Sequence, residues 1–156
     1  MAELIAAPNE LIYRWLAERS GLVRVEDFLG IARRVDGRIV AAFGYDHHQD
    51  SSCMFHVAAE PGGIDREMLR RGFWVPFVQW GYSCLIGVIQ SKNSKSLEIA
   101  ARLGFTQRLV LPGAHPSGAL HWWVMYRNEC PWLQENKNNE RRRKRTPGTE
   151  PVGEHE

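Results

Sequence analysis

Residues 88–105 read VIQSKNSKSLEIAARLGF, and this stretch decides the fold. Its first residues end the apolar run LIGVI, which is typical of a buried strand. Asn93 or Ser94 can cap a helix, because either side chain has an oxygen that accepts hydrogen bonds from free backbone amides. Apolar residues then recur at helical spacing as far as Gly104, which is the expected left-handed end of a helix. The stretch therefore predicts a buried strand, a capped helix, a glycine stop and, from Phe105, another strand.

The composition is that of one globular domain. The chain has 156 residues, of which 44% are hydrophobic and 24% charged. No apolar run approaches the roughly 20 residues that a membrane helix needs. The first residues, MAELIAAPNELIYRW, lack the charged and apolar regions of a signal peptide. Cys53, Cys84 and Cys130 are far apart and form no CxxC spacing, which favours a reduced, cytoplasmic protein over a disulfide framework or a zinc site.

The charges are concentrated near the C-terminus. Residues 134–156 contain six Lys/Arg and five Asp/Glu, and removing these from the totals of 20 and 18 leaves 14 and 13 for residues 1–133. Because Val152 is the only aliphatic or aromatic residue after Leu133, we expect a folded domain over 1–133 and a disordered charged tail over 134–156. The basic run 141–145 is either a solvated segment or a weak, salt-sensitive contact to nucleic acid, for which the near-neutral body offers no surface.

Strand and helix patterns alternate along the domain. Two β-type runs flank Asp36-Gly37, which is a strong hairpin signal. The other predicted elements are a helix over 9–19, a strand over 53–60, a helix over 65–80 kinked at Pro76, and strands over 83–90, 105–111 and 121–127, the last two joined by a PGAHPSG loop. The strand–helix–strand passages imply at least one parallel pair with a right-handed crossover. We therefore predict a mixed α/β fold.

This element order, over about residues 9–127, resembles that of the GNAT superfamily, the Gcn5-related N-acetyltransferases. The segment LIGVIQSKNSKSLEIAARLGF is similar to the family's strand, turn ending in Asn, and helix closing on Leu-Gly-Phe. The strand CMFHVAAE and the aromatic-rich helix also resemble small GNAT-like proteins of bacteriophages and prophages. The resemblance implies a mostly antiparallel sheet in which one parallel pair of strands splays apart, with helices on its flanks.

The resemblance also implies that acetyl-CoA binds as a cosubstrate between the splayed strands, here 53–60 and 84–90. Pantetheine would lie along the exposed edge of the first strand, and the pyrophosphate on the free amides that begin the following helix. A backbone N–H near Val57 or Ala58 would stabilise the oxyanion. The expected cofactor-binding residues are Val57, Ala58, Gly62, Gly63, Arg66 and Asn93.

Two positions depart from the family's pattern. The phosphate loop usually reads Arg/Gln-x-x-Gly-x-Gly/Ala, whereas this chain has GGIDREML. Gly62 and Gly63 either let the backbone approach the phosphates, with Arg66 adding a cation, or form an ordinary turn before a helix capped by Asp65. The Asp65 carboxylate would repel a diphosphate. The Tyr that protonates the leaving thiolate in many members is replaced by Ala100.

Three residues are candidates for proton transfer. His56 lies in the middle of a strand, and a neutral imidazole suits a general base for an ammonium acceptor, although a histidine there can also be bonded to a neighbour. Glu60 could act as a base through water or be a solvated loop acid. Ser96 could face the same side as Ala100 or be an ordinary first-turn serine. We expect Asn93 to cap the helix and also to contact the pantetheine arm.

Other polar and aromatic residues are weaker candidates. His47 and His48 are adjacent in a loop and cannot easily face one ion, so we predict no metal site. Trp122, Trp123 and Tyr126 could line an acceptor cleft, although alternation places the two tryptophans on opposite faces of a strand.

The sequence thus favours an N-acetyltransferase that moves an acetyl group from acetyl-CoA to an amine acceptor, either a small molecule or a protein; a homodimer is possible. The alternative is a catalytically inactive GNAT-fold binding or regulatory module, which Ala100 and the altered loop suggest. A third hypothesis, an enzyme that modifies nucleic acid, depends on the basic run alone.

Overall fold

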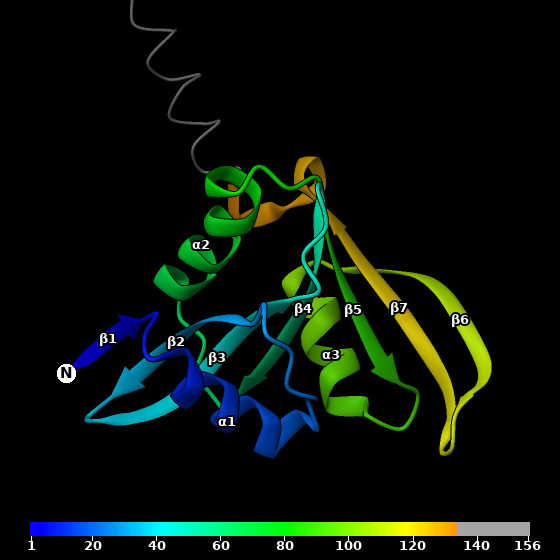
Figure 1. The fold of residues 1–156 in the computed structure, drawn as a ribbon, viewed down its shortest axis with the longest axis horizontal. Coiled ribbons are helices and arrows are strands. Elements are labelled where there is room, and N and C mark those ends of the chain that lie inside the picture. Colours follow the sequence, from blue (N-terminus) through cyan, green and yellow to red (C-terminus); the bar gives the residue numbers. More distant parts are fainter. Residues whose placement is uncertain (134–156) are drawn as a thin grey trace, which may run out of the picture.

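The computed structural model describes residues 1–133, and the tail predicted over 134–156 lies outside the described residues. Seven strands in this part form one sheet in the order β1-β2-β3-β4-β5-β7-β6 (Figure 1). The strands are β1 Ala2–Ile5, β2 Leu29–Val35, β3 Arg38–Asp46, β4 Ser52–Ala59, β5 Cys84–Gln90, β6 Thr106–His115 and β7 Gly118–Tyr126. The helices are α1 Asn9–Ser20, α2 Arg66–Trp74 and α3 Ser94–Leu103, with short turns η1 Val75–Gln79, η2 Arg127–Glu129 and η3 Pro131–Leu133.

The sheet is antiparallel throughout except between β4 and β5, so the predicted mixed α/β fold is confirmed. These two strands pair only from Ser52 opposite Cys84 to Met54 opposite Ile86. Beyond that point β4 stays paired with β3, and β5 stays paired with β7. The two strands therefore diverge, as Figure 1 shows, and leave a gap in the middle of the sheet.

Strand alternation sends side chains to two separate cores. On one face, α1 packs against the sheet through Ile12 and Leu16, which contact Ala42 of β3. On the other face, α2 and α3 cover a larger aromatic core, to which the sheet contributes Phe43 and Phe55. The side chains of β4 and β5 that border the gap are consequently divided between the two faces of the sheet.

The ends of the helices follow the local signals. The Asn93 side-chain oxygen accepts a hydrogen bond from the Ser96 amide at 3.1 Å, and Gly104 ends α3 with φ at 103°, so the predicted cap and stop are confirmed. The Asp65 carboxylate caps α2 by accepting from the Met68 amide at 2.8 Å. At Pro76 the α-helical hydrogen bonding gives way to the π-helical turn η1, which agrees with the predicted interruption.

Two features differ from the sequence-based prediction. Strand β1 was not predicted, because a four-residue edge strand carries too little pattern to be seen before its partner is known. The predicted PGAHPSG loop is wrong, since β6 continues to His115 and β7 starts at Gly118. A register shift between Leu111 and His115 accommodates Pro112, which an edge strand tolerates because its N–H need not bond a neighbour.

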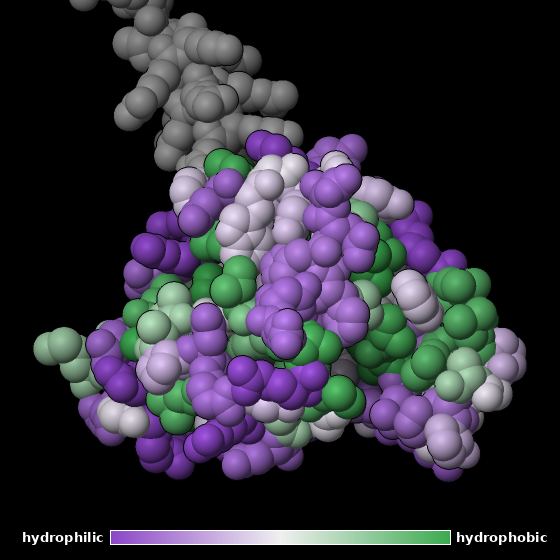
Figure 2. Space-filling view, viewed as in Figure 1, coloured by the Kyte–Doolittle hydropathy of each residue, from purple (hydrophilic) through white to green (hydrophobic). Residues whose placement is uncertain are grey.

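The β6–β7 hairpin carries exposed apolar surface. Leu109, Val110 and Leu111 of the edge strand β6 are 48%, 38% and 38% exposed, and green surface marks this side of the molecule in Figure 2. The homodimer considered from the sequence stays a prediction, and this edge is a surface on which it could form. Within residues 1–133, the helices are all too short or too polar to cross a bilayer.

The turn between β4 and α2 yields a prediction about stability. A Cβ atom on Gly63 would lie 2.3 Å from the Val40 carbonyl oxygen, whereas one on Gly87 would meet nothing closer than 3.9 Å. We expect Gly63→Ala to lower the free energy of unfolding by roughly 1–3 kcal/mol because of this overlap with backbone. Gly87→Ala, measured by the same urea titration, should have a free energy of unfolding close to that of the parent. Equal stability of both variants would show that the turn can relax.

Candidate active site

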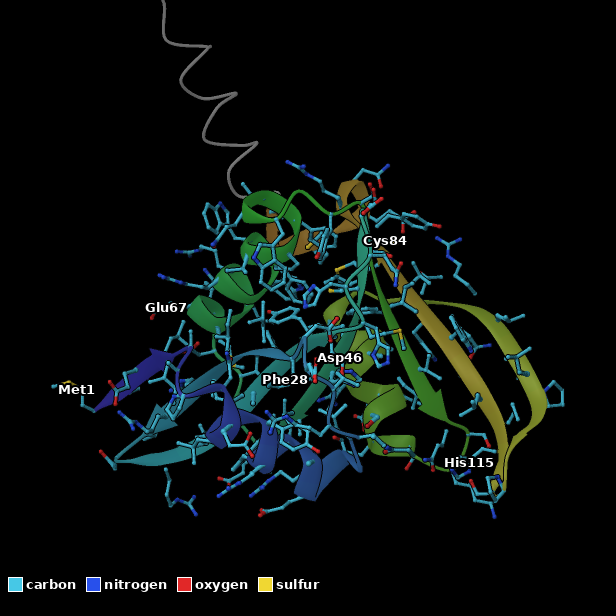
Figure 3. The ribbon with its side chains drawn as sticks, in the orientation of Figure 1. Met1, Phe28, Asp46, Glu67, Cys84 and His115 are labelled. Atoms are coloured by element: carbon cyan, nitrogen blue, oxygen red, sulfur yellow. The ribbon has the colours of Figure 1, made fainter. Side chains whose placement is uncertain are left out.

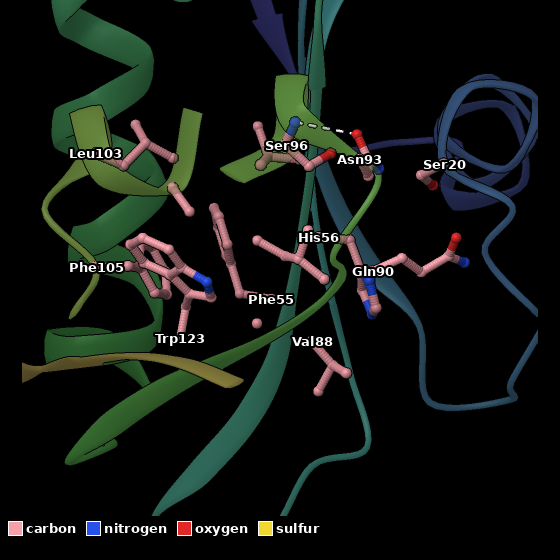
Figure 4. Close-up of a pocket in the computed structure, with 14 residues that line it drawn as sticks. Ser20, Phe55, His56, Val88, Gln90, Asn93, Ser96, Leu103, Phe105 and Trp123 are labelled. Atoms are coloured by element: carbon pink, nitrogen blue, oxygen red, sulfur yellow. Dashed lines mark hydrogen bonds between the residues drawn. The ribbon is translucent and has the colours of Figure 1, made fainter. Parts of the chain in front are cut away.

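The gap between β4 and β5 contains a cavity of about 100 Å³ (Figure 4). Because β4 and β5 are parallel and in register at Met54, His56 and Gln90 lie on the face that α1 covers, while Phe55 lies on the face of α3. The cavity is lined by residues of β4, β5, α3, the end of α1 and β7, among them Ser20, Phe55, His56, Val57, Gln90, Asn93, Ser96, Ala100 and Trp123. It therefore connects the two faces of the sheet.

A second cavity, of about 470 Å³, lies between the turn before α2 and the side of α3. It shares Leu103 with the first cavity, so the two are neighbours. Its walls include Gly62 and Gly63 on one side and the cationic side chains of Lys95 and Arg102 on the other. Arg102 is also paired with Glu98 at 2.5 Å. Together the two cavities offer a narrow passage of mixed polar and apolar lining, followed by a wider space in which the cations Lys95 and Arg102 stand beside the acids Glu60 and Glu98.

His56 is held by a buried carboxylate. Its Nε2 lies 2.7 Å from Oδ1 of Asp46, the last residue of β3, and Asp46 is fully buried in the interior (Figure 3). His47 Nδ1 lies 2.9 Å from the same oxygen. Because a carboxylate only accepts hydrogen bonds, His56 carries its proton on Nε2 and keeps the lone pair of Nδ1 free. This arrangement orients the ring and leaves one nitrogen able to take a proton.

The charge on Asp46 is maintained by its two histidine partners. Burial alone would raise the pKa of Asp46, but the hydrogen bonds with His56 and His47 outweigh it and leave that pKa below its usual value. The contact with Asp46 in turn raises the pKa of His47. Sequence reasoning missed Asp46. The available signal was an acidic residue that ends the apolar strand sequence AAFGYD directly before the bend at His47.

The predicted cofactor-binding residues are divided between the two cavities. Val57 and Asn93 line the first, and Gly62 and Gly63 the second. Arg66 is exposed at the start of α2. The Ala58 side chain instead packs toward α1, and ladder alternation directs its backbone N–H to β3, so Ala58 faces away from the gap. The other placements are compatible with the predicted roles, which stay predictions.

The expected repulsion by Asp65 is removed by an arginine that is distant in sequence. Arg33 of β2 lies with its Nε 2.9 Å from an Asp65 carboxylate oxygen, and its Nη1 donates to the Gly63 carbonyl at 3.1 Å. The carboxylate is therefore neutralised, and the turn is pinned to the sheet. The pairing could not be predicted from the sequence because it depends on how β2 lies beside the turn.

The proton-transfer candidates are not all brought together. Ser96 and Ala100 line the cavity that also contains His56, and Ala100 is only 6% exposed. Glu60 lines the second cavity and is paired with Arg38 at 3.1 Å, so we leave it out of the proposed chemistry. Burial raises the pKa of the Cys53 thiol to about 12, which makes it a poor nucleophile. No cluster in residues 1–133 could hold a metal ion.

The coupling of Asp46 to His47 predicts a pH-dependent stability. Asp46→Asn should lower the free energy of unfolding by roughly 1.5–3 kcal/mol, since it weakens hydrogen bonds to a buried charged group. Because the pKa of Asp46 is lowered by folding, its ionised form stabilises the protein at pH values above the pKa of aspartate in the unfolded chain, about 3.9. Because the pKa of His47 is raised by folding, its protonated form stabilises the protein at acid pH, and this contribution is lost as the pH rises through the pKa of folded His47. The difference between parent and variant should therefore be larger at mildly acid than at alkaline pH.

The measurement is a pair of urea titrations on each protein. One is made at a mildly acid pH, at which Asp46 is ionised and His47 is protonated, and the other above pH 8. Asp50→Asn, which alters an exposed carboxylate in the next loop, is the matched control and should change little at either pH. If Asp46→Asn lowers the free energy of unfolding by the same amount at both pH values, the coupling to His47 is contradicted.

Comparison with known proteins gives a structural likeness only. No protein-family model matches the sequence, and no curated protein matches it. The fold is similar to that of mutant forms of the spermidine/spermine N-acetyltransferase SpeG from Vibrio cholerae, with a TM-score of 0.67 over 86% of this chain and 99% of that one at 10% identity. The fold is also similar to that of a further mutant of the spermidine N-acetyltransferase SpeG from the same organism. The TM-score is 0.67 at 9% identity, over 86% of this chain and 98% of the other. The chain therefore has the same fold as these N-acetyltransferases.

Proposed function

We propose that this protein is an N-acetyltransferase that transfers an acetyl group from acetyl-CoA to an amine. The observation that carries the proposal is the position of His56. Its free ring nitrogen belongs to a residue in the wall of the gap between β4 and β5, where the cavity connects both faces of the sheet. A base on one face and a channel on the other are what a direct transfer between two substrates requires.

We place acetyl-CoA on the side of α2 and α3. The wider cavity with Lys95 and Arg102 would hold the phosphates. The pantetheine arm would run through the narrower passage along the unpaired edge of β4 and past Asn93. Asn93 uses its side-chain oxygen to cap α3, so its amide NH₂ would be the group that donates to the arm.

We place the acceptor on the opposite side, near α1. The lining on this face includes the polar side chains of Ser20, His56 and Gln90, which could receive an amine. The V. cholerae neighbours are named as spermidine N-acetyltransferases, and for this chain we propose an amine acceptor of the same general class without assigning that compound.

The chemical step would be a direct attack by the amine on the thioester. His56 Nδ1 takes a proton from the amine nitrogen, and Asp46 stabilises the imidazolium that forms. The nitrogen then bonds to the thioester carbonyl carbon, and the backbone N–H of Val57, which ladder alternation directs into the gap, donates to the developing oxyanion. The carbon–sulfur bond breaks and its electron pair goes to the sulfur, so no covalent enzyme intermediate is needed.

One observation favours a second candidate, a GNAT-fold module that binds without catalysis. Ala100 places a methyl group in the cavity at the position where the resemblance leads us to expect a tyrosine acid. A protein that bound CoA and transferred nothing to any amine would fit this alternative.

Acetyl transfer to a panel of primary amines and polyamines, followed by release of the CoA thiol, tests the proposal. We expect His56→Gln to reduce kcat/KM by roughly 10²–10⁴-fold, because it removes the general base. Acetyl-CoA affinity, measured by calorimetry, should change little. His115→Gln, the same substitution at a histidine of the β6–β7 hairpin that lines neither cavity, should have the kcat/KM and the acetyl-CoA affinity of the parent.

Two results would count against the proposal in different ways. Absence of CoA binding at millimolar concentration would contradict the binding site itself. Binding without transfer to any amine, or equal activity of the parent and His56→Gln, would contradict the catalytic role and favour the non-catalytic module.

A further inference from the structure

An indole N–H near the gap has no hydrogen-bond partner. Nε1 of Trp123 is buried, and among residues 1–133 nothing accepts a hydrogen bond from it. A buried donor without an acceptor is a net cost to the fold, and such groups are rare in native proteins. An indole can only donate, so the missing partner must be an acceptor.

The position of Trp123 points to where that acceptor comes from. Trp123 lies opposite Gly87, the first residue of β5 after its pairing with β4 ends. Trp123 is two residues before the buried Met125 in β7, so strand alternation puts the Trp123 side chain on the same face, that of α3. Gly87 has no side chain, and the nearest atoms to a Cβ built there are 3.9 Å away, so there is room beside the indole. Figure 4 shows the ring reaching from β7 toward Phe55 at the cavity.

The two faces of the gap have different chemistry. His56 lies on the face of α1, from which the amine would attack, so the leaving group departs toward the face of α3. On that face Ala100 offers no polar group, and the side-chain oxygen of Asn93 is occupied by the Ser96 amide. Trp123 is thus a side-chain donor already located on the side to which the sulfur leaves.

We propose that Trp123 donates its indole N–H to the sulfur of the CoA leaving group and stabilises the thiolate. The inference rests on the proposed function, since it requires acetyl-CoA in the gap. In the step, the amine nitrogen bonds to the carbonyl carbon, the carbon–sulfur bond breaks, and its electrons stay on sulfur. His56 holds the proton lost by the amine, while the indole keeps its own proton and only shares it in a hydrogen bond. Trp123 is therefore a catalytic residue that is not an acid.

Trp122 provides a matched control. Its indole Nε1 is also buried and has no partner among the described residues. It lies opposite Val88, however, and is directed to the other face of β7. It is not among the residues that line the cavity. Trp122→Phe therefore removes a similar unpaired donor from the face opposite the one to which the sulfur leaves.

The direct test is a titration of the thiol of bound CoA, followed by the ultraviolet absorbance of its thiolate against desulfo-CoA as reference. We expect Trp123→Phe to raise that thiol pKa by about one relative to the parent, a tenfold loss of thiolate stabilisation. The same variant should lower kcat by about 10- to 100-fold, since a hydrogen bond to a charged group is lost. Trp122→Phe should leave the thiol pKa unchanged, because its indole lies on the opposite face of β7 from the sulfur.

A second substitution keeps the shape of the ring. Benzothienylalanine at position 123 replaces the indole N–H by sulfur, so it removes the donor if Trp123→Phe disturbs folding, and it should raise the thiol pKa equally. An unchanged thiol pKa in both 123 variants, even with a lower kcat, would overturn the role of Trp123 and leave the acetyltransferase proposal intact. Failure of the parent to bind CoA would overturn both.

Discussion

The early end of the pairing between β4 and β5 is the constraint on which the rest of the molecule depends. The two strands share only three residue pairs, and each then follows its other neighbour. The backbone groups that would have bonded across the gap are left to bond something else, and an extended ligand arm can do so. The same divergence lets side chains from both faces of the sheet line one cavity.

The buried carboxylate of Asp46 is the second requirement. An ion in the interior is costly unless it is hydrogen-bonded, and Oδ1 of Asp46 meets this condition through His56 and His47, while Oδ2 has no partner among residues 1–133. His56 is partly buried beside the gap, with 22% of its side chain exposed, whereas His47 is 60% exposed at the surface. The carboxylate therefore ties the position of His56 to a loop histidine, and the site is built partly by residues that no substrate would touch.

Much of the fold could be predicted from the sequence because its signals are local. Asn93 and Gly104 delimit α3, and Asp36-Gly37 forms the turn between β2 and β3 as expected. The site was harder to predict, since its decisive contacts join residues that are far apart. Asp46 reaches His56 only because β3 and β4 pair, and Arg33 reaches Asp65 only through the turn that follows β4. Trp123 could be assigned to one face by alternation, but its unpaired N–H is visible only in three dimensions.

The most direct test of the central claim is backbone hydrogen exchange with and without CoA. Ligand bound along the unpaired edge of β4 should slow the exchange of amides in residues 55–60 and at the start of α2, because these groups gain partners and lose contact with water. Amides of the β6–β7 hairpin should exchange at the same rate in both samples. Exchange in residues 55–60 that is unaffected by CoA, or protection confined to another part of the sheet, would contradict the assignment of this gap as the cofactor site.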